Sequence, residues 1–143
     1  MANIFYNNAK ELLLNGGLDL DTDTIKASLH TSSYTPDADA HDFWDDATNE
    51  VSTSGSYTAG IAGGITLAGK VVSQDNTDDE AVFDANDLSI TGFTGTFKWI
   101  VLRKDTGVAG TSPLICAIDI TSATATTGTV AVTWSSEGII NLG

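Results

Sequence analysis

Three aspartates at alternate positions, Asp19, Asp21 and Asp23, form the sharpest chemical pattern in this 143-residue chain. Their order matches the start of an EF-hand loop, whose first carboxylates bind calcium. The sixth position is Thr24 rather than glycine and the twelfth is His30 rather than glutamate, so the EF-hand pattern fails. On one face of a strand, the three aspartates are weak candidates for a cation site. The alternative, which we favour, is a charged strand edge that discourages aggregation, and we expect no metal.

The other reactive residue types do not form a catalytic pattern. His30 and His41 are the only histidines, and no GxSxG motif marks a nucleophile. Cys116 is expected on the same strand face as Leu114 and Ile118, as a core side chain. The glycine-rich stretch 60–64 lacks the spacing and the lysine of a phosphate loop. We therefore expect no enzyme, no catalytic residue, no cofactor and no small-molecule substrate.

The charge of the chain is strongly acidic, with 19 acids against 6 bases and a formal net charge of −13. Nucleic acid and anionic membranes are bound by clustered Lys and Arg, so neither is an expected partner. The excess of acids favours solubility, and it also permits partners with basic patches or divalent cations.

Residues 37–50 contain six acids and no base. They also include Trp44, a residue type enriched at contact hot spots. The alternative is an arm that packs Phe43, Trp44 and Tyr57 against its own sheet. The residues expected to form the partner interface are Asp37, Asp39, Asp42, Phe43, Trp44, Asp45 and Asp46.

Hydrophobic periodicity places these residues on a mainly β scaffold. Residues 1–17 predict an N-terminal helix that begins at Asn3 as N-cap and ends at Gly16 and Gly17. Ile25 to His30 alternates as a half-buried strand, and from residue 64 short alternating runs follow one another. Turns are expected at 76–79, 105–107 and 127–128, and residues 97–102 predict a central strand covered on both faces. The pattern indicates an antiparallel β-sandwich (jelly-roll-like) or a small barrel with one N-terminal α-helix.

One domain, 1–143, accounts for the chain. It divides into the helix at 1–17, a strand with an acidic and Gly/Ser-rich arm at 18–63, and a β-strand core at 64–143. The N-terminus lacks a signal-peptide pattern, and the chain has a single cysteine. These features favour a protein made in a reducing cytoplasm.

Several blocks of the sequence together resemble small acidic structural proteins of tailed-bacteriophage virions. The blocks are residues 15–51, SYTAG at 56–60, LAGK at 67–70, VFDANDLSITG at 82–92, VLRKDTGVAGTSPLICAIDI at 101–120 and TVAVTWSSEGIINL at 129–142. The family typically has an apolar residue where this chain has His30. The resemblance implies a particle component and brings no catalytic residues.

The resemblance does not say where on the particle the protein sits. A compact β domain with an acidic loop and an N-terminal amphipathic helix favours a bacteriophage capsid decoration (cement) protein that binds between subunits of the major capsid protein. Virion parts usually add their contacts through closed symmetric oligomers, so self-association is expected, with a homotrimer favoured. The expected location is the virion, on the capsid surface, after synthesis in the host cytoplasm. Two alternatives remain open: a tail or head–tail connector subunit, and, in another class, a cation-dependent carbohydrate-binding module.

Overall fold

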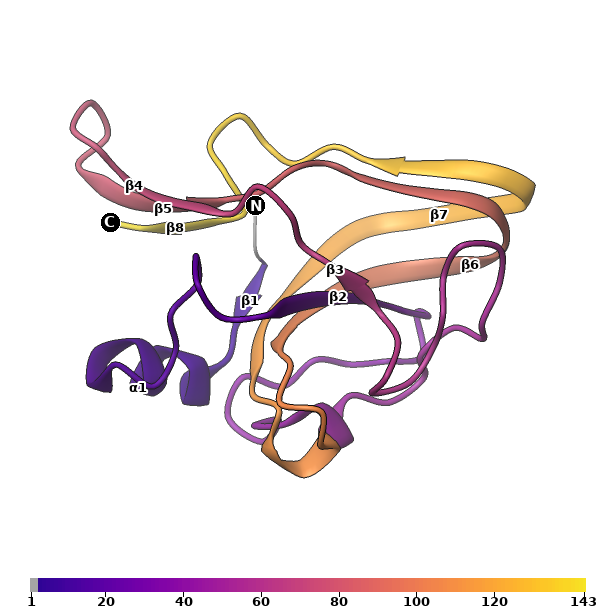
Figure 1. Ribbon diagram of the computed structural model, residues 1–143, viewed down its shortest axis with the longest axis horizontal. Helices are drawn as coiled ribbons and strands as arrows, with labels where there is room; N and C mark the ends of the chain where they lie inside the picture. Colours follow the sequence, from indigo (N-terminus) through magenta and orange to yellow (C-terminus); the bar gives the residue numbers. More distant parts are fainter. Residues whose placement is uncertain (1–2) are drawn as a thin grey trace.

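The computed structural model describes residues 3–143, whose strands form two antiparallel sheets (Figure 1). One sheet has the order β1-β7-β6-β2-β3, and the other has the order β4-β5-β8. The fold is thus the expected mainly β class, and of the two alternatives it is a sandwich rather than a closed barrel. The strands are β1 (Ile4–Phe5), β2 (Ile25–His30), β3 (Ile65–Thr66), β4 (Val71–Asp75), β5 (Glu80–Asp84), β6 (Leu88–Lys104), β7 (Leu114–Val132) and β8 (Ile140–Leu142).

A long ribbon of β6 and β7 connects the two layers. It rises from the turn between these strands, curves, and returns towards the three-stranded sheet (Figure 1). The prediction of a turn at Thr127–Gly128 is wrong, because these residues lie within β7. The pairing of β6 with β7 shifts register between Phe93 and Gly95, and Thr127 has a positive φ of 47°. A β-bulge and a turn both favour such backbone angles, so the sequence signal is the same for both.

Helix α1 (Asn7–Asn15) is shorter than the expected helix over 1–17. Ile4 and Phe5 instead pair with β7 as strand β1, and Tyr6 takes the N-cap position. Asn3 is therefore not the cap, and residues 1 and 2 lie outside the described residues. The stop at Gly16 is confirmed, with a left-handed φ of 77°. No helix within residues 3–143 has the length and apolar character needed to cross a membrane.

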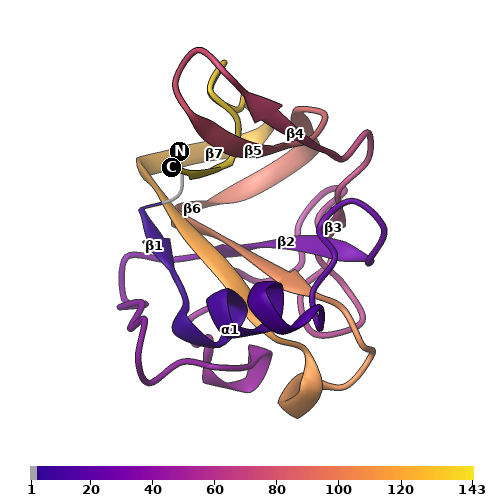
Figure 2. The same cartoon turned by 90° about the vertical axis from the view of Figure 1, so that its left-hand side faces the viewer.

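The five-stranded sheet is covered on both faces, which confirms the prediction for residues 97–102. One face packs on α1 and the three-stranded sheet, which Figure 2 shows as separate layers. Residues 31–64 are called the arm from here on. Tyr6 and part of the arm, with Tyr34, Trp44 and Ile61, cover the other face, whereas Val51 and Tyr57 of the arm pack in the main core. Main-core side chains include Leu29, Phe83, Ile100, Leu102, Cys116, Ile118 and Ile140; those on the arm side are Tyr6, Tyr34, Trp44, Val101, Leu114 and Ala117.

The arm also fills the bulged part of β6. The backbone N–H groups of Thr91 and Thr94 donate to the hydroxyls of Ser56 (2.9 Å) and Ser54 (2.8 Å). Between these serines Gly55 has a φ of 59°, and a Cβ there would lie 2.1 Å from the carbonyl oxygen of Thr91. Backbone atoms cannot yield to such an overlap, so only glycine fits between the arm and β6.

We expect Gly55→Ala to destabilise the protein by about 3 kcal/mol or more, because it adds a backbone clash to an unfavourable φ. Gly107→Ala is the matched control: its φ is 81°, but a Cβ there meets nothing within 4 Å. The control should lose only about 1 kcal/mol. Urea unfolding followed by tryptophan fluorescence measures both values. Equal losses would contradict the close approach of arm and sheet.

Candidate functional site

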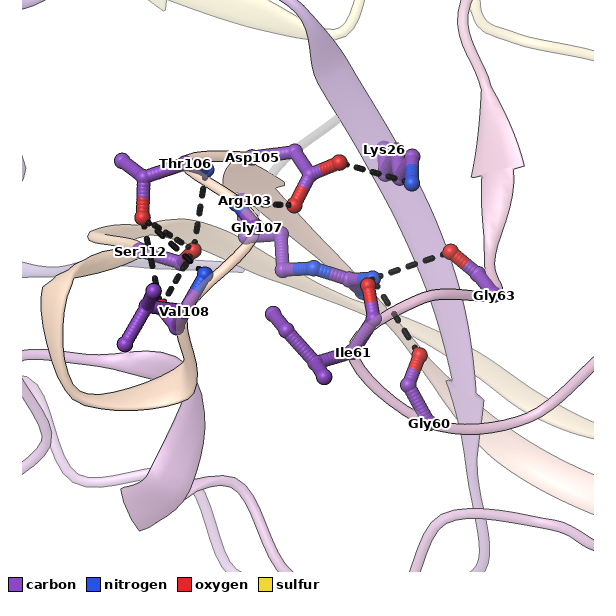
Figure 3. Close-up of polar contacts among 10 residues, drawn as sticks. All are labelled: Lys26, Gly60, Ile61, Gly63, Arg103, Asp105, Thr106, Gly107, Val108 and Ser112. Atoms are coloured by element: carbon purple, nitrogen blue, oxygen red, sulfur yellow. Dashed lines mark hydrogen bonds and ion pairs between the residues drawn. The ribbon is translucent and has the colours of Figure 1, made fainter.

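Arg103 of β6 organises the arm, and its side chain is fully buried. The guanidinium carbon lies 4.1 Å from the centroid of the Trp44 ring, within cation–π distance. Nη2 donates hydrogen bonds to the carbonyl oxygens of Gly60 (3.4 Å), Ile61 (3.1 Å) and Gly63 (3.0 Å), as Figure 3 shows. One arginine therefore holds both the acidic part and the glycine-rich part of the arm.

Two carboxylates balance the buried guanidinium from a greater distance. Burial lowers the pKa of Arg103, and the charges of Asp105 and Glu50 oppose that effect; an arginine stays protonated in either case. Asp105 forms an ion pair with Lys26 (2.7 Å; Figure 3). Glu50 accepts hydrogen bonds from the hydroxyl of Tyr57 (2.6 Å) and the N–H of Gly60 (2.8 Å). Glu50 is thus engaged in holding the arm, whereas Asp105 pairs with β2.

His30 is buried in the same layer and forms structural contacts. Its Nδ1 lies 2.7 Å from the carbonyl oxygen of Thr48, so Nδ1 carries the proton. Its Nε2 lies 3.0 Å from the hydroxyl of Ser28, and its ring packs in a T-shaped arrangement with that of Trp44, with 5.5 Å between the ring centroids. Burial lowers the pKa of His30 to about 4, and the charge of Arg103 adds to that shift against the hydrogen bond to Thr48. A buried neutral imidazole between a serine and a carbonyl anchors the arm.

The expected interface residues divide into three groups by exposure. Asp37, Asp39 and Asp45 are exposed, Asp42, Phe43 and Asp46 are half-buried, and Trp44 is only 7% exposed. The ring of Trp44 therefore belongs to the packing of the arm on its own sheet. The exposed carboxylates around it remain the candidates for contact with a partner.

The acidic segment 37–46 is held firmly at several points. The side chain of Asn7 at the start of α1 donates to Asp39, and the N–H of Leu114 donates to the carbonyl of Asp42 at 3.0 Å. Tyr34, just before the segment, bonds through its hydroxyl to that of Tyr6 at 2.8 Å. The segment thus presents its carboxylates on a fixed backbone.

Asp19, Asp21 and Asp23 lie in a turn, so the expectation of three carboxylates on one strand face is wrong. Asp23 forms an ion pair with Lys104 (2.8 Å) and accepts a hydrogen bond from the N–H of Asp19. The turn brings these donors close to the carboxylate of Asp23. This carboxylate therefore stabilises the local fold through bonds within the chain.

Another acidic group lies elsewhere on the surface, at Asp78, Glu80 and Glu137. One carboxylate oxygen of each residue lies within 4.8 Å of the others, which is compatible with a hard cation. The side chain of Asn141 donates to Glu80 at 2.6 Å, so part of this cluster is already satisfied. Exposed acids often group in this way without an ion.

Cys116 is buried, as expected for a core side chain. Burial raises the pKa of its thiol to about 12, so it stays protonated. It shares the main core with Ile118, but Leu114 lies on the arm side, because the pairing slips between Leu102 and Arg103. The groups at the centre of the fold thus serve packing, and the exposed chemistry of the described chain is chiefly that of carboxylates.

Comparisons with protein-family models, with curated proteins and with solved structures found no match for this chain. The resemblance to structural proteins of tailed phages therefore stays a prediction.

We expect Arg103→Met to destabilise the protein by about 3 kcal/mol or more, because buried carbonyls lose their donor and the Trp44 ring loses its cation. Lys98→Met is the matched control. Its ammonium lies 5.2 Å from the ring centroid of Trp99 and 3.4 Å from Asp119, but it is partly exposed. The control should lose less than about 1 kcal/mol. Urea unfolding gives both values, and comparable losses would show that Arg103 does not organise the arm.

We also expect His30 to make stability depend on pH. Its pKa is about 4 in the folded chain and 6.5 as the ordinary value. Below pH 6.5 the unfolded chain binds the proton more readily, so stability falls as pH decreases towards 4. The difference between these two pKa values corresponds to a loss of about 3 kcal/mol in the free energy of unfolding at most.

The measurement is the free energy of unfolding from pH 7 to 4, compared with the His30→Gln variant, whose curve should be flatter. This comparison removes the contributions of the carboxylates, which both proteins share. Parallel curves would mean that His30 does not carry the pH dependence.

Proposed function

We propose that this chain is a structural protein of a bacteriophage particle, a capsid decoration protein that binds the major capsid protein through its acidic segment 37–46. One observation carries the proposal: the segment is anchored by buried groups while Asp37, Asp39 and Asp45 remain exposed. The sequence blocks that resemble virion proteins of tailed phages include this segment.

A fixed acidic surface suits repeated attachment to a particle. Ordering a flexible loop on binding costs free energy, and a loop already held by Trp44 and Tyr34 avoids much of that cost. Exposed carboxylates recognise basic patches and accelerate association with them. This attraction weakens as the salt concentration increases. The proposed partner surface on the capsid is accordingly basic.

A threefold capsid site fits a trimer, because a symmetric oligomer repeats one contact around one axis. A tail or head–tail connector subunit could use the same acidic surface and would form a ring instead. The mass of the purified protein in solution, measured by light scattering, separates a trimer from a ring of six or twelve.

We expect the purified chain to sediment with capsids assembled from the major capsid protein of the same genome. Replacing Asp37 and Asp45 by Asn should weaken binding by about tenfold or more, since each exposed carboxylate faces a basic partner. The matched control replaces Asp78 and Asp79, two exposed acids of the β4–β5 turn. It removes the same charge and should bind as the unchanged chain does. Absence of co-sedimentation at low salt would exclude the decoration role, and equal losses in both variants would exclude segment 37–46 as the interface.

A further inference from the structure

A groove of about 510 Å³ lies between α1 and the three-stranded sheet, and one of its walls is a face of that sheet. Strand pairing places Val72, Phe83 and Ile140 in one row across β4, β5 and β8. The next row on the same face contains Ala81 and Leu142. Figures 1 and 2 both show the small sheet and α1 on opposite sides of this region. The other wall includes Leu13, Leu18 and Leu20.

The apolar face of the small sheet extends beyond its cover. Phe83 and Ile140 are buried, whereas Val72 in the same row is 49% exposed and Leu142 is 47% exposed. Single exposed apolar residues are ordinary on a protein surface, but a continuous patch that lines a groove marks an interaction site. The volume lies within the range of sites that bind ligands or side chains of a partner.

The mouth of the groove carries negative charge. Asp19 and Asp21 line it, and their exposed carboxyl groups lie close enough to interact. That contact lowers the pKa of Asp19 and raises that of Asp21, as expected for two carboxyls competing for one proton. Residues 71–97, which include β4 and β5, contain six acids and no base. Lys70 already acts on Asp21, and a further cation at the mouth would relieve the remaining repulsion between the two aspartates.

We propose that this groove binds an amphipathic segment of a partner protein, which places apolar side chains against the small sheet and Lys or Arg beside Asp19 and Asp21. Helices and sheets cover exposed sheet faces in stable folds. An amphipathic helix enters such grooves through apolar side chains spaced three and four residues apart. The partner helix would lie beside α1 and complete the cover of the sheet.

Charge selects this occupant over a second copy of the chain. A copy carries 19 acids against 6 bases, so it would bring further negative charge to an acidic mouth. The groove shares no lining residue with segment 37–46. The inference therefore goes beyond the proposed capsid contact and does not depend on it.

Two fluorescent peptides of about four helical turns test the proposal with the intact chain. Both carry Leu along one face, and the remaining positions are Lys in one peptide and Glu in the other. We expect the Lys peptide to bind, measured by fluorescence anisotropy, and the Glu peptide to bind at least about tenfold more weakly. Binding of the Lys peptide should weaken as salt increases.

Variants locate the binding to the groove. Leu142→Asp, Val72→Asp and the double variant Asp19→Asn, Asp21→Asn should each weaken the Lys peptide by about tenfold or more. The use of two separate strands keeps the test valid if one substitution unfolds the protein, which thermal melting would reveal. Val108→Asp is the matched control for the apolar positions, because Val108 is 59% exposed and lies outside the groove. Asp78→Asn with Asp79→Asn is the control for charge.

Binding lost in the groove variants and kept in the controls supports the proposal. Equal binding of the Lys and Glu peptides, or equal losses in groove and control variants, would overturn it. A dimer of the unchanged chain that Leu142→Asp dissociates would also overturn it, since the occupant would then be a second copy. A lipid or other small molecule that copurifies with the chain and is lost in Leu142→Asp would assign the groove to a different class of ligand.

Discussion

The contact between the buried guanidinium of Arg103 and the ring of Trp44 is the constraint on which the rest of the structure depends. Removing a cation from water costs free energy, and an apolar interior offers few groups that could stabilise the cation in place of water. Here the aromatic face and three carbonyl oxygens of the arm take the place of water. Since these groups come from distant parts of the arm, they can solvate the cation together only if the arm is folded down on the sheet.

This constraint explains why the five-stranded sheet has two unlike faces. The face towards α1 is apolar, as in an ordinary sandwich. The face towards the arm contains Ser28, His30 and Arg103 as buried polar groups. Ser28 and His30 bond to the sheet and the arm, whereas the side chain of Arg103 bonds only through Nη2, and its Nε and Nη1 have no hydrogen-bond partner among the described residues. Polar layers of this kind favour one arrangement over others, because a shifted arm would leave donors and acceptors unpaired. The fixed position of segment 37–46 follows from that selectivity.

Local signals in the sequence predicted the features that depend on local physics. The glycine stop of the first helix, strand β2, the turn at 76–79 and the covered central strand are confirmed. The alternation of Lys26, Ser28 and His30 indicated a half-buried strand, yet a distant segment covers that face. Nothing in the sequence predicted that Arg103 is buried, because a basic residue beside a turn is usually exposed to solvent. The sequence leaves open whether Trp44 lies at the surface or in the interior, and the position of Arg103 decides for the interior.

The pairing of β1 with β7 links opposite ends of the chain, and this has a consequence for folding kinetics. Such non-local pairing forms slowly, because much chain must be ordered before the contact stabilises anything. Until β7 has emerged from the ribosome, β6 lacks its main neighbour, and α1 and the arm lack most of their support. The nascent protein therefore exposes apolar strands during most of its synthesis. The high density of acids along the chain supplies repulsion that keeps such intermediates apart.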